Sequence, residues 1–344
     1  MIELGVEPQR KSVAIAEDEL ADYLILGDFG GAATEPMTIH RNNLDAVMAR
    51  MHVNLDGVSF REIKDFHPDR LYRNLDLFRQ LDGAGREVTL GEHMRSVLHD
   101  PSFQSVEAAW RGLDFLIRNE SGDNAGTRIR IAHFPKADAA RDLLDAQSVS
   151  DTRMSALLTA RKWRAIIGLY EFGPDLADIE FLGRMALLAA NARAPFIAAG
   201  SAGMGDHWDE LRAIPEAAYL GLALPRFLLR LPYGARTEAI ESFLFEEMPG
   251  VPVHAHYLWG NPALAFLMLL TSGGGALNLP GLPLHSYQHE GEWRMTPWAE
   301  MWMTETQVLE RMALGLMPLV SFPDSDRVRL AGFRAINGEE LALP

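Results

Sequence analysis

Short apolar runs alternate with amphipathic helical segments along most of this chain. The runs at residues 164–170, 195–199 and 220–224 are almost entirely apolar, and the segment between the first two, residues 176–193, has helical spacing. Strands that alternate with helices in this way form a sheet with helices on both faces. We therefore predict an α/β fold in which helices cover a mixed sheet. The 344 residues, with 48% hydrophobic content, supply a substantial core for it.

The remaining segments fit the same alternation. A short strand at residues 23–26 should end in the loop at residues 27–31, and the sequence Asp-Gly-Ala-Gly at residues 82–85 predicts a linker, which we place at residues 83–90. Residues 1–19 carry no clear pattern and are treated as an N-terminal extension. Periodicity predicts helices at residues 42–51, 69–81, 91–99, 102–118, 137–158 and 261–271, and strands at residues 58–63 and 128–132.

Composition excludes several classes of function. The formal net charge is −15, whereas nucleic-acid binding draws much of its affinity from basic surfaces, so we expect no nucleic-acid partner. The chain has no cysteine, which excludes disulfides, thiolate metal sites and a cysteine nucleophile. The first residues do not resemble a signal peptide, and the longest apolar run, residues 263–270, is far shorter than the ~20 residues of a membrane span. We expect a cytoplasmic protein without membrane insertion.

The candidate catalytic motifs are weak. His254 and His256 would share one face of a strand, as two metal ligands might, with His285, His289 or a carboxylate as the third ligand. The small-residue loop around Ser201 misses the spacing of a nucleophile elbow by one position. A metal-dependent hydrolase that uses His254 and His256 therefore stays an alternative, whereas the favoured interpretation has no catalytic residue, no metal and no cofactor.

Two arginines interrupt the apolar segment ALPRFLLRLPYG, residues 223–234. Arg226 and Arg230 have no strong general base or nucleophile motif beside them. The stem of an arginine packs against apolar surface while its planar fork binds carboxylates or carbonyls in a fixed geometry. The pair is predicted to brace the structure rather than to hold a substrate.

Aromatic and methionine residues gather in the stretch WRMTPWAEMWM, residues 293–303. Exposed residues of these types are typical of the centre of a protein interface, whereas buried ones are ordinary core. Both interpretations stay open at this point. Trp298 and Trp302 are the interface candidates from this stretch.

Seven motifs, taken in order, resemble the large subunit of the contractile sheath of the bacterial type VI secretion system. They are PSFQSVEAAWRGL (residues 101–113), IGLYEF (167–172), APFIA (194–198), the segment that ends in LPRFLLRLPYG (218–234), YLWGN (257–261), GLPLH (281–285) and LGLMPL (314–319). The second motif departs from the family at Leu169, where the family has aspartate. The first motif adds Trp110 and Arg111 to the structural or interface candidates.

The region before the linker resembles the small sheath subunit. The resemblance rests on LILGDF (residues 24–29), the helical segment 42–51 and FREIKDFHPD (60–69). In that family the two subunits are separate chains that intertwine. The resemblance thus divides the chain into a small-subunit-like part at residues 20–82, a linker at 83–90 and a large-subunit-like part at 91–344, with the first and last expected to pack as one body.

The resemblance implies a structural protein rather than an enzyme. In that family the segment with Arg226 and Arg230 belongs to the structural body of the large subunit. The resemblance does not extend to the large subunit's second domain, whose strands pair with strands of neighbouring subunits, so we expect an accessory, capping or baseplate-docking subunit. A minimal sheath protein that polymerises by itself and a regulator that binds sheath subunits in solution are the alternatives. The implied partners are sheath subunits, the inner tube protein, the baseplate and further copies of this chain.

Overall fold

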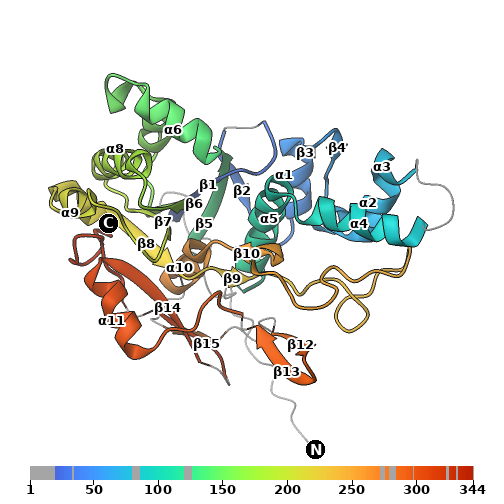
Figure 1. Ribbon diagram of the computed structural model, residues 1–344. Coiled ribbons are helices and arrows are strands. Elements are labelled where there is room, and N and C mark those ends of the chain that lie inside the picture. Colours follow the sequence, from blue (N-terminus) through green and yellow to red (C-terminus); the bar gives the residue numbers. More distant parts are fainter. Residues whose placement is uncertain are drawn as a thin grey trace, which may run out of the picture.

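The centre of the molecule is a nine-stranded sheet with the strand order β11-β15-β14-β8-β7-β6-β1-β5-β2 (Figure 1). This computed structural model describes residues 20–32, 35–79, 86–119, 126–271, 276–278, 284–296, 298–322, 325–330 and 332–343. The strands are β1 (Ala21–Gly27), β2 (Met37–Ile39), β5 (Thr127–His133), β6 (Ala165–Phe172), β7 (Phe196–Gly200), β8 (Leu220–Leu224), β11 (Ala276–Asn278), β14 (Leu316–Phe322) and β15 (Ser325–Leu330). The prediction of a mixed sheet in an α/β fold is confirmed.

The six inner strands, from β14 to β5, are parallel to one another. At the edges, β2 pairs with β5 and β15 pairs with β14 in the antiparallel direction, as does β11 with β15. The inner strands are apolar on both faces because helices cover both sides, and for this reason β7 and β8 read as continuous apolar runs in the sequence.

The helices form two layers, one on each face of the sheet (Figure 1). On one face lie α5 (Pro101–Asn119) and α10 (Pro262–Thr271), which share a core with Ile25, Ile131 and Ile167, and α4 (Arg86–Leu98) packs against α5. On the other face lie α6 (Lys136–Leu144), α7 (Arg153–Thr159), α8 (Leu176–Ala192) and α9 (Trp208–Arg212). Alternate side chains of β1 pack on opposite faces of the sheet. Ile25 belongs to the core under the first helix layer, and Leu24 and Leu26 belong to the core under the second.

The chain before the linker packs against the first layer. Its elements are β1, β2, α1 (Leu44–Met51), the hairpin of β3 (Asn54–Leu55) and β4 (Val58–Ser59), α2 (Pro68–Asn74) and α3 (Asp76–Arg79). Phe60 and Phe66 stack on each other and meet Phe103 of α5 edge to face. These contacts, together with the pairing of β1 with β5 and β6, join residues 20–79 to the rest of the sheet.

Three predicted elements are shorter than the sequence suggested. The helix expected at residues 69–81 breaks at Leu75, whose backbone is extended, and gives α2 and α3. The helix expected at residues 137–158 is interrupted before Ser148 and Thr152, which cap a 3-10 turn and α7 with their side chains. The strand expected at residues 58–63 ends at Ser59, and a 3-10 helix at Ile63–Phe66 follows.

The predicted linker at residues 83–90 is only partly a linker. Residues 80–85 lie outside the described residues, as does the predicted extension at residues 1–19, but α4 begins at Arg86, so residues 86–90 are helical. The sequence analysis also missed β2, β11, β14 and β15, the hairpin of β12 (His285–His289) and β13 (Glu292–Thr296), and α11 (Glu305–Ala313). The hairpin is short and mostly polar, whereas α11 opens with a capping box of Thr304 and Gln307 that was available as a signal.

Candidate assembly site

Arg230 lies in the interior between two buried carboxylates. Its Nε is 2.9 Å from Oε1 of Glu107, on α5, and its Nη1 is 2.7 Å from Oε2 of Glu247. The relative solvent exposure is 0% for Glu107, 1% for Glu247 and 8% for Arg230, so all three side chains are buried. A charged group at this depth is tolerated only when it is paired and hydrogen-bonded, so this arrangement requires all three side chains.

Arg111 and Tyr233 complete the buried network. Arg111 lies 2.6 Å from Glu107 Oε1 and donates to the Tyr233 hydroxyl at 2.8 Å. The Tyr233 backbone N–H donates to Glu247 at 2.7 Å, and the Arg230 guanidinium sits 4.4 Å from the centroid of the Tyr233 ring. The formal charges of the two arginines and two glutamates cancel. The network therefore ties α5 to the segment of residues 230–247, which has little regular secondary structure of its own.

The network shifts the pKa values of Glu247 and Arg230. Burial alone would raise the pKa of Glu247, but the charge of Arg230 and hydrogen bonds from Arg230 and the Tyr233 backbone N–H overcome it and lower the pKa to about 2. Burial likewise opposes the charge of Arg230, yet Glu107 and Glu247 raise its pKa well above its usual value. Arg230 and Glu247 are therefore both charged at neutral pH, which suits a brace and does not suit a proton donor or acceptor.

Arg226 forms a second brace near the surface. It follows β8 and binds Glu300 with both sides of its fork, from Nε at 2.9 Å and from Nη2 at 2.5 Å, while its Nη1 lies 3.5 Å from Glu171 of β6. The backbone N–H of Glu300 donates to the Arg226 carbonyl at 2.9 Å. Hydrogen bonds from Arg226 lower the pKa of Glu300 against the opposing effect of burial. The contacts join the sheet to the segment around residue 300.

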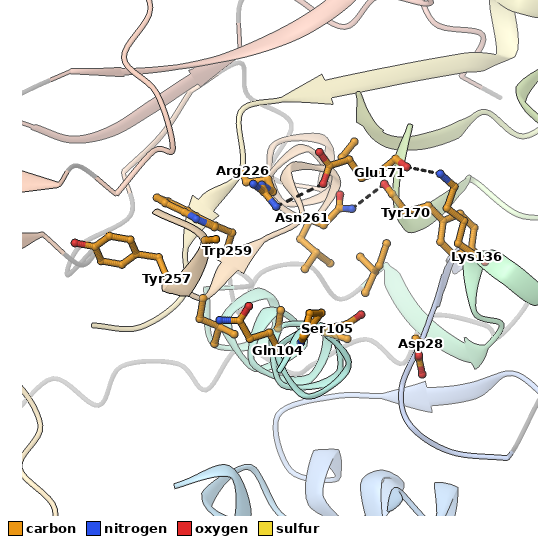
Figure 2. Close-up of a pocket in the computed structure, with 18 of the residues that line it drawn as sticks. Asp28, Gln104, Ser105, Lys136, Tyr170, Glu171, Arg226, Tyr257, Trp259 and Asn261 are labelled. Atoms are coloured by element: carbon orange, nitrogen blue, oxygen red, sulfur yellow. Dashed lines mark hydrogen bonds and ion pairs between the residues drawn. The ribbon is translucent and has the colours of Figure 1, made fainter. Parts of the chain in front are cut away.

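A crevice of about 490 Å³ lies next to this brace, at the carboxyl ends of the parallel strands (Figure 2). Asp28 follows β1, Glu171 belongs to the end of β6, and Gln104 reaches in from α5. The chain leaves β1 through the first helix layer and leaves β6 through the second, so the crevice lies where the winding of the sheet reverses, a common ligand position in α/β folds.

The cations of the crevice already have partners. Lys136 lies 2.6 Å from Asp178 and donates to the Glu171 carbonyl at 2.6 Å, and Arg226 is held by Glu300. The Tyr170 hydroxyl donates to the Phe134 carbonyl at 2.5 Å, and burial raises its pKa. These side chains therefore provide no poised acid, base or nucleophile in the crevice.

The suggestion that His254 and His256 bind a metal assumed that both residues lie on a strand. The structure shows that this assumption is wrong. Residues His254–His256 form a 3-10 helix, which sends the imidazoles to different neighbours. His254 lies 3.3 Å from Glu300, whereas His256 stacks on His99 with 3.8 Å between the ring centroids. In the part of the chain that the structure describes, no group of three or more histidine, cysteine or acidic residues could hold a metal ion.

The other residues of that alternative are also engaged elsewhere. His285 Nδ1 is 2.7 Å from the Tyr257 hydroxyl, and His289 lies 3.9 Å from Glu290. The Ser201 hydroxyl donates to the Gly203 carbonyl at 2.6 Å. The structure therefore does not bring these residues together with His254 and His256 as the hydrolase interpretation required.

The tryptophan candidates lie in different environments. Trp110 is fully buried, donates from Nε1 to the Phe29 carbonyl at 3.0 Å and meets the Phe29 ring edge to face. Trp298 is also buried, at 5% exposure, whereas Trp302 is 47% exposed and Trp293 is 62% exposed. The aromatic stretch thus divides between core and surface, and a role of Trp302 in an interface stays a prediction.

Sequence reasoning found the arginines but missed the carboxylates that hold them. Glu107 precedes Arg111 by four residues, a spacing that indicates a helical ion pair and was available as a signal. Glu247 and Glu300 gave no signal in the sequence. Glu247 lies 17 residues from Arg230 and Glu300 lies 74 residues from Arg226, so only the fold brings each pair together.

Comparison with known proteins gives two matches. The VipB family, described as EvpB/VC_A0108, tail sheath N-terminal domain, matches residues 86–207 and 205–337. The type VI secretion system sheath protein TssC1 of Pseudomonas aeruginosa is 27% identical over 303 residues, which cover 74% of this chain. The chain spans 60% of the length of that curated relative. Within the described residues, no helix is both long and apolar enough to span a membrane.

Proposed function

Since this chain belongs to the VipB tail sheath N-terminal domain family, we propose that it is a non-enzymatic structural component of a type VI secretion sheath. In this proposal it is an accessory subunit that caps the sheath or docks it to the baseplate. The observation that carries the proposal is the buried network in which Arg230 pairs with both Glu107 and Glu247, and in which the pKa shifts of Arg230 and Glu247 favour the charged form of each. Such groups stiffen a wall and perform no proton transfer.

We further propose that residues 20–82 correspond to a small sheath subunit and residues 91–344 to the large subunit. The position of β1 supports this, because it pairs with β5 on one side and with β6 on the other, within one chain. The matched family residues begin at residue 86 and so leave β1 out. A single chain of this kind would supply both parts of a sheath protomer at a fixed ratio.

One edge of the sheet favours a cap over a lattice subunit. Strand addition between subunits needs an exposed edge with several backbone groups. The edge strand β2 has three residues. This edge offers few main-chain hydrogen bonds to a neighbour. Contacts with sheath subunits would then run mainly through side chains, and the tube, the baseplate and further copies of this chain are the other proposed partners, all in the bacterial cytoplasm.

Negative-stain electron microscopy with light scattering tests this role. The purified protein would be imaged alone and then with separately purified sheath subunits and inner tube from the same bacterium. We expect a monomer or small oligomer that decorates only the ends of sheaths. Tubes or rings of the protein alone would establish a self-assembling sheath protein instead, and one-to-one complexes that never join a polymer would establish a regulator. No association in any mixture would refute the assembly role.

A further inference from the structure

The two cations of the crevice at the carboxyl ends of the parallel strands are more than balanced by carboxylates. Arg226 stands between two of them, because Glu300 binds both sides of its fork and Glu171 lies 3.5 Å from its Nη1. Lys136 is neutralised by Asp178, at 2.6 Å. These contacts alone leave one negative charge in excess at the crevice.

Asp28 adds a second negative charge. Its only ion-pair contact within the described residues is with His133, whose Nδ1 lies 3.8 Å from Oδ1. That nitrogen accepts a hydrogen bond from the Phe29 backbone N–H at 3.1 Å, and burial lowers the pKa of His133, so the imidazole is neutral at pH 7. The side chains of Asp28 and Glu171 are 42% and 54% exposed, so a ligand can reach both carboxylates from the solvent.

Hydrogen bonding in the crevice shows the same imbalance. The side-chain amides of Gln104 and Asn261 and the indole of Trp259 already donate to backbone carbonyls of this chain, at 3.2, 3.0 and 3.0 Å. In the part of the chain that the structure describes, no donor of the protein meets Asp28 Oδ2, Glu171 Oε1 or Gln104 Oε1. The crevice thus has free acceptors and engaged donors, and it favours a ligand that is both positively charged and rich in donors.

The shape of the crevice suits an organic cation better than a metal ion. Its volume of about 490 Å³ lies in the range of small-ligand sites. Figure 2 shows Asp28 towards one end and Trp259 towards the other, with Gln104 and Ser105 of α5 between them. Among the described residues, no three histidine or acidic side chains converge closely enough to hold a metal ion. The free acceptors are therefore spread along a groove with an aromatic wall.

We propose that this crevice binds an arginine side chain presented by a segment of a partner subunit. A guanidinium has five N–H donors, no acceptor and a permanent positive charge, which complements the free acceptors and the excess negative charge. It is also more weakly hydrated than an ammonium group, and its planar face stacks on aromatic rings such as the indole of Trp259. That the arginine belongs to a subunit rests on the proposed function, whereas the preference for a guanidinium does not.

Titration of the full chain with a capped pentapeptide, one arginine flanked by two glycines on each side, tests the proposal by nuclear magnetic resonance of the peptide. We expect saturable binding that weakens as salt is added and that falls about tenfold in Asp28→Asn and in Glu171→Gln. The asparagine keeps the acceptor for the Gly30 N–H, so the loop after β1 stays in place. The matched control is Glu310→Gln, which removes one exposed charge from α11, outside the crevice, and should bind as the natural chain does. Equal loss in all three variants, or no saturable binding by the natural chain up to ~10 mM peptide, would overturn the proposal.

Related ligands test the chemistry of the occupant. The same peptide with citrulline, which has the shape of arginine without its charge, should bind at least tenfold more weakly, and equal binding would overturn the proposal. Tighter binding of a lysine peptide would show an ammonium site, and displacement of the peptide by a lower concentration of Ca²⁺ would show a metal site; either result overturns it as well. The chain also has an arginine and a lysine before β1, Arg10 and Lys11. A variant with glutamine at both positions should bind the peptide unchanged, whereas a large gain of binding would mean that the chain's own residues fill the crevice.

A stability measurement separates a binding site from a brace. Asp28→Asn and Glu171→Gln should unfold at the same urea concentration as the natural chain, because each removes an exposed charge from a region with excess negative charge. A clear loss of stability in both would mean that these carboxylates support the fold, which would overturn the proposal. The two residues follow different strands, so one variant remains informative if the other is unstable. Because these readouts need no sheath, their failure is distinguishable from failure of the assembly role in electron microscopy.

Discussion

Replacing Arg230 with methionine should be the most damaging single change in the buried network. The stem of methionine fills much of the same space, but Glu247 loses a guanidinium at 2.7 Å, while Glu107 keeps Arg111 at 2.6 Å. Breaking a buried pair in this way costs about 3–5 kcal/mol. The net lowering of the Glu247 pKa from 4.5 to about 2 corresponds to about 3 kcal/mol in favour of its charged form, a balance to which Arg230 contributes the largest lowering effect. Urea unfolding followed by tryptophan fluorescence measures the loss.

The pH dependence of that loss has a definite sign. In the natural chain the pKa of Glu247 is lower in the folded state, so its contribution is complete above about pH 4.5 and disappears as the pH falls towards 2. In Arg230→Met the buried carboxylate takes up a proton more readily than in the unfolded chain, so acid relieves the defect. The difference in unfolding free energy between the two proteins should therefore narrow as the pH falls from 7 to 4.

The matched control is an exposed pair on the same helix. Arg118 on α5 lies 2.8 Å from Asp114 with 64% of its side chain exposed. Arg118→Met should cost less than about 1 kcal/mol, because water screens surface pairs. A loss of similar size for Arg118→Met and Arg230→Met, or an Arg230→Met deficit that does not change with pH, would refute the interpretation of the buried network.

Three further changes test other parts of the account. Trp110→Phe removes the hydrogen bond to the Phe29 carbonyl and leaves a gap, so it should cost about 1–3 kcal/mol in urea unfolding. Gly315→Ala should prevent stable folding, since Gly315 has φ +78° and an added Cβ would lie 1.9 Å from the Ile336 carbonyl oxygen, and thermal unfolding followed by circular dichroism would detect it. Trp302→Ser should change stability by less than about 0.5 kcal/mol because Trp302 is 47% exposed, but it should reduce co-sedimentation with sheath subunits if this residue contributes to the interface.

The sequence predicts five of the six inner strands, all except β14, and the long helices α5 and α8, for a physical reason. Strands such as β7 and β8 are buried on both faces and read as continuous apolar runs, and α5 keeps its apolar stripe over 19 residues. Breaks are harder to predict, because the end of α2 at Leu75 interrupts neither the periodicity nor the helix-forming composition. Hydrophobic periodicity indicates which residues are buried, but it does not indicate where a short polar turn interrupts a helix.

The site was predictable only in part. Arg226 and Arg230 stand out because charge is rare in an apolar segment, so a bracing role could be inferred from the sequence. Their partners could not, since Glu107 lies 123 residues from Arg230 and Glu300 lies 74 residues from Arg226. The prediction that His254 and His256 share one face of a strand was wrong, because their spacing alone does not distinguish a strand from the 3-10 helix found at His254–His256.

The number of copies bound per sheath tests the central claim most directly. Sheaths of measured length would be sedimented with a labelled form of this protein, and the bound copies counted by quantitative fluorescence. The account predicts a small number of copies per sheath that does not change with sheath length, as expected for a subunit bound at the ends. A copy number that grows in proportion to length would identify a lattice subunit, and the absence of the protein from the sheath pellet would contradict the structural role.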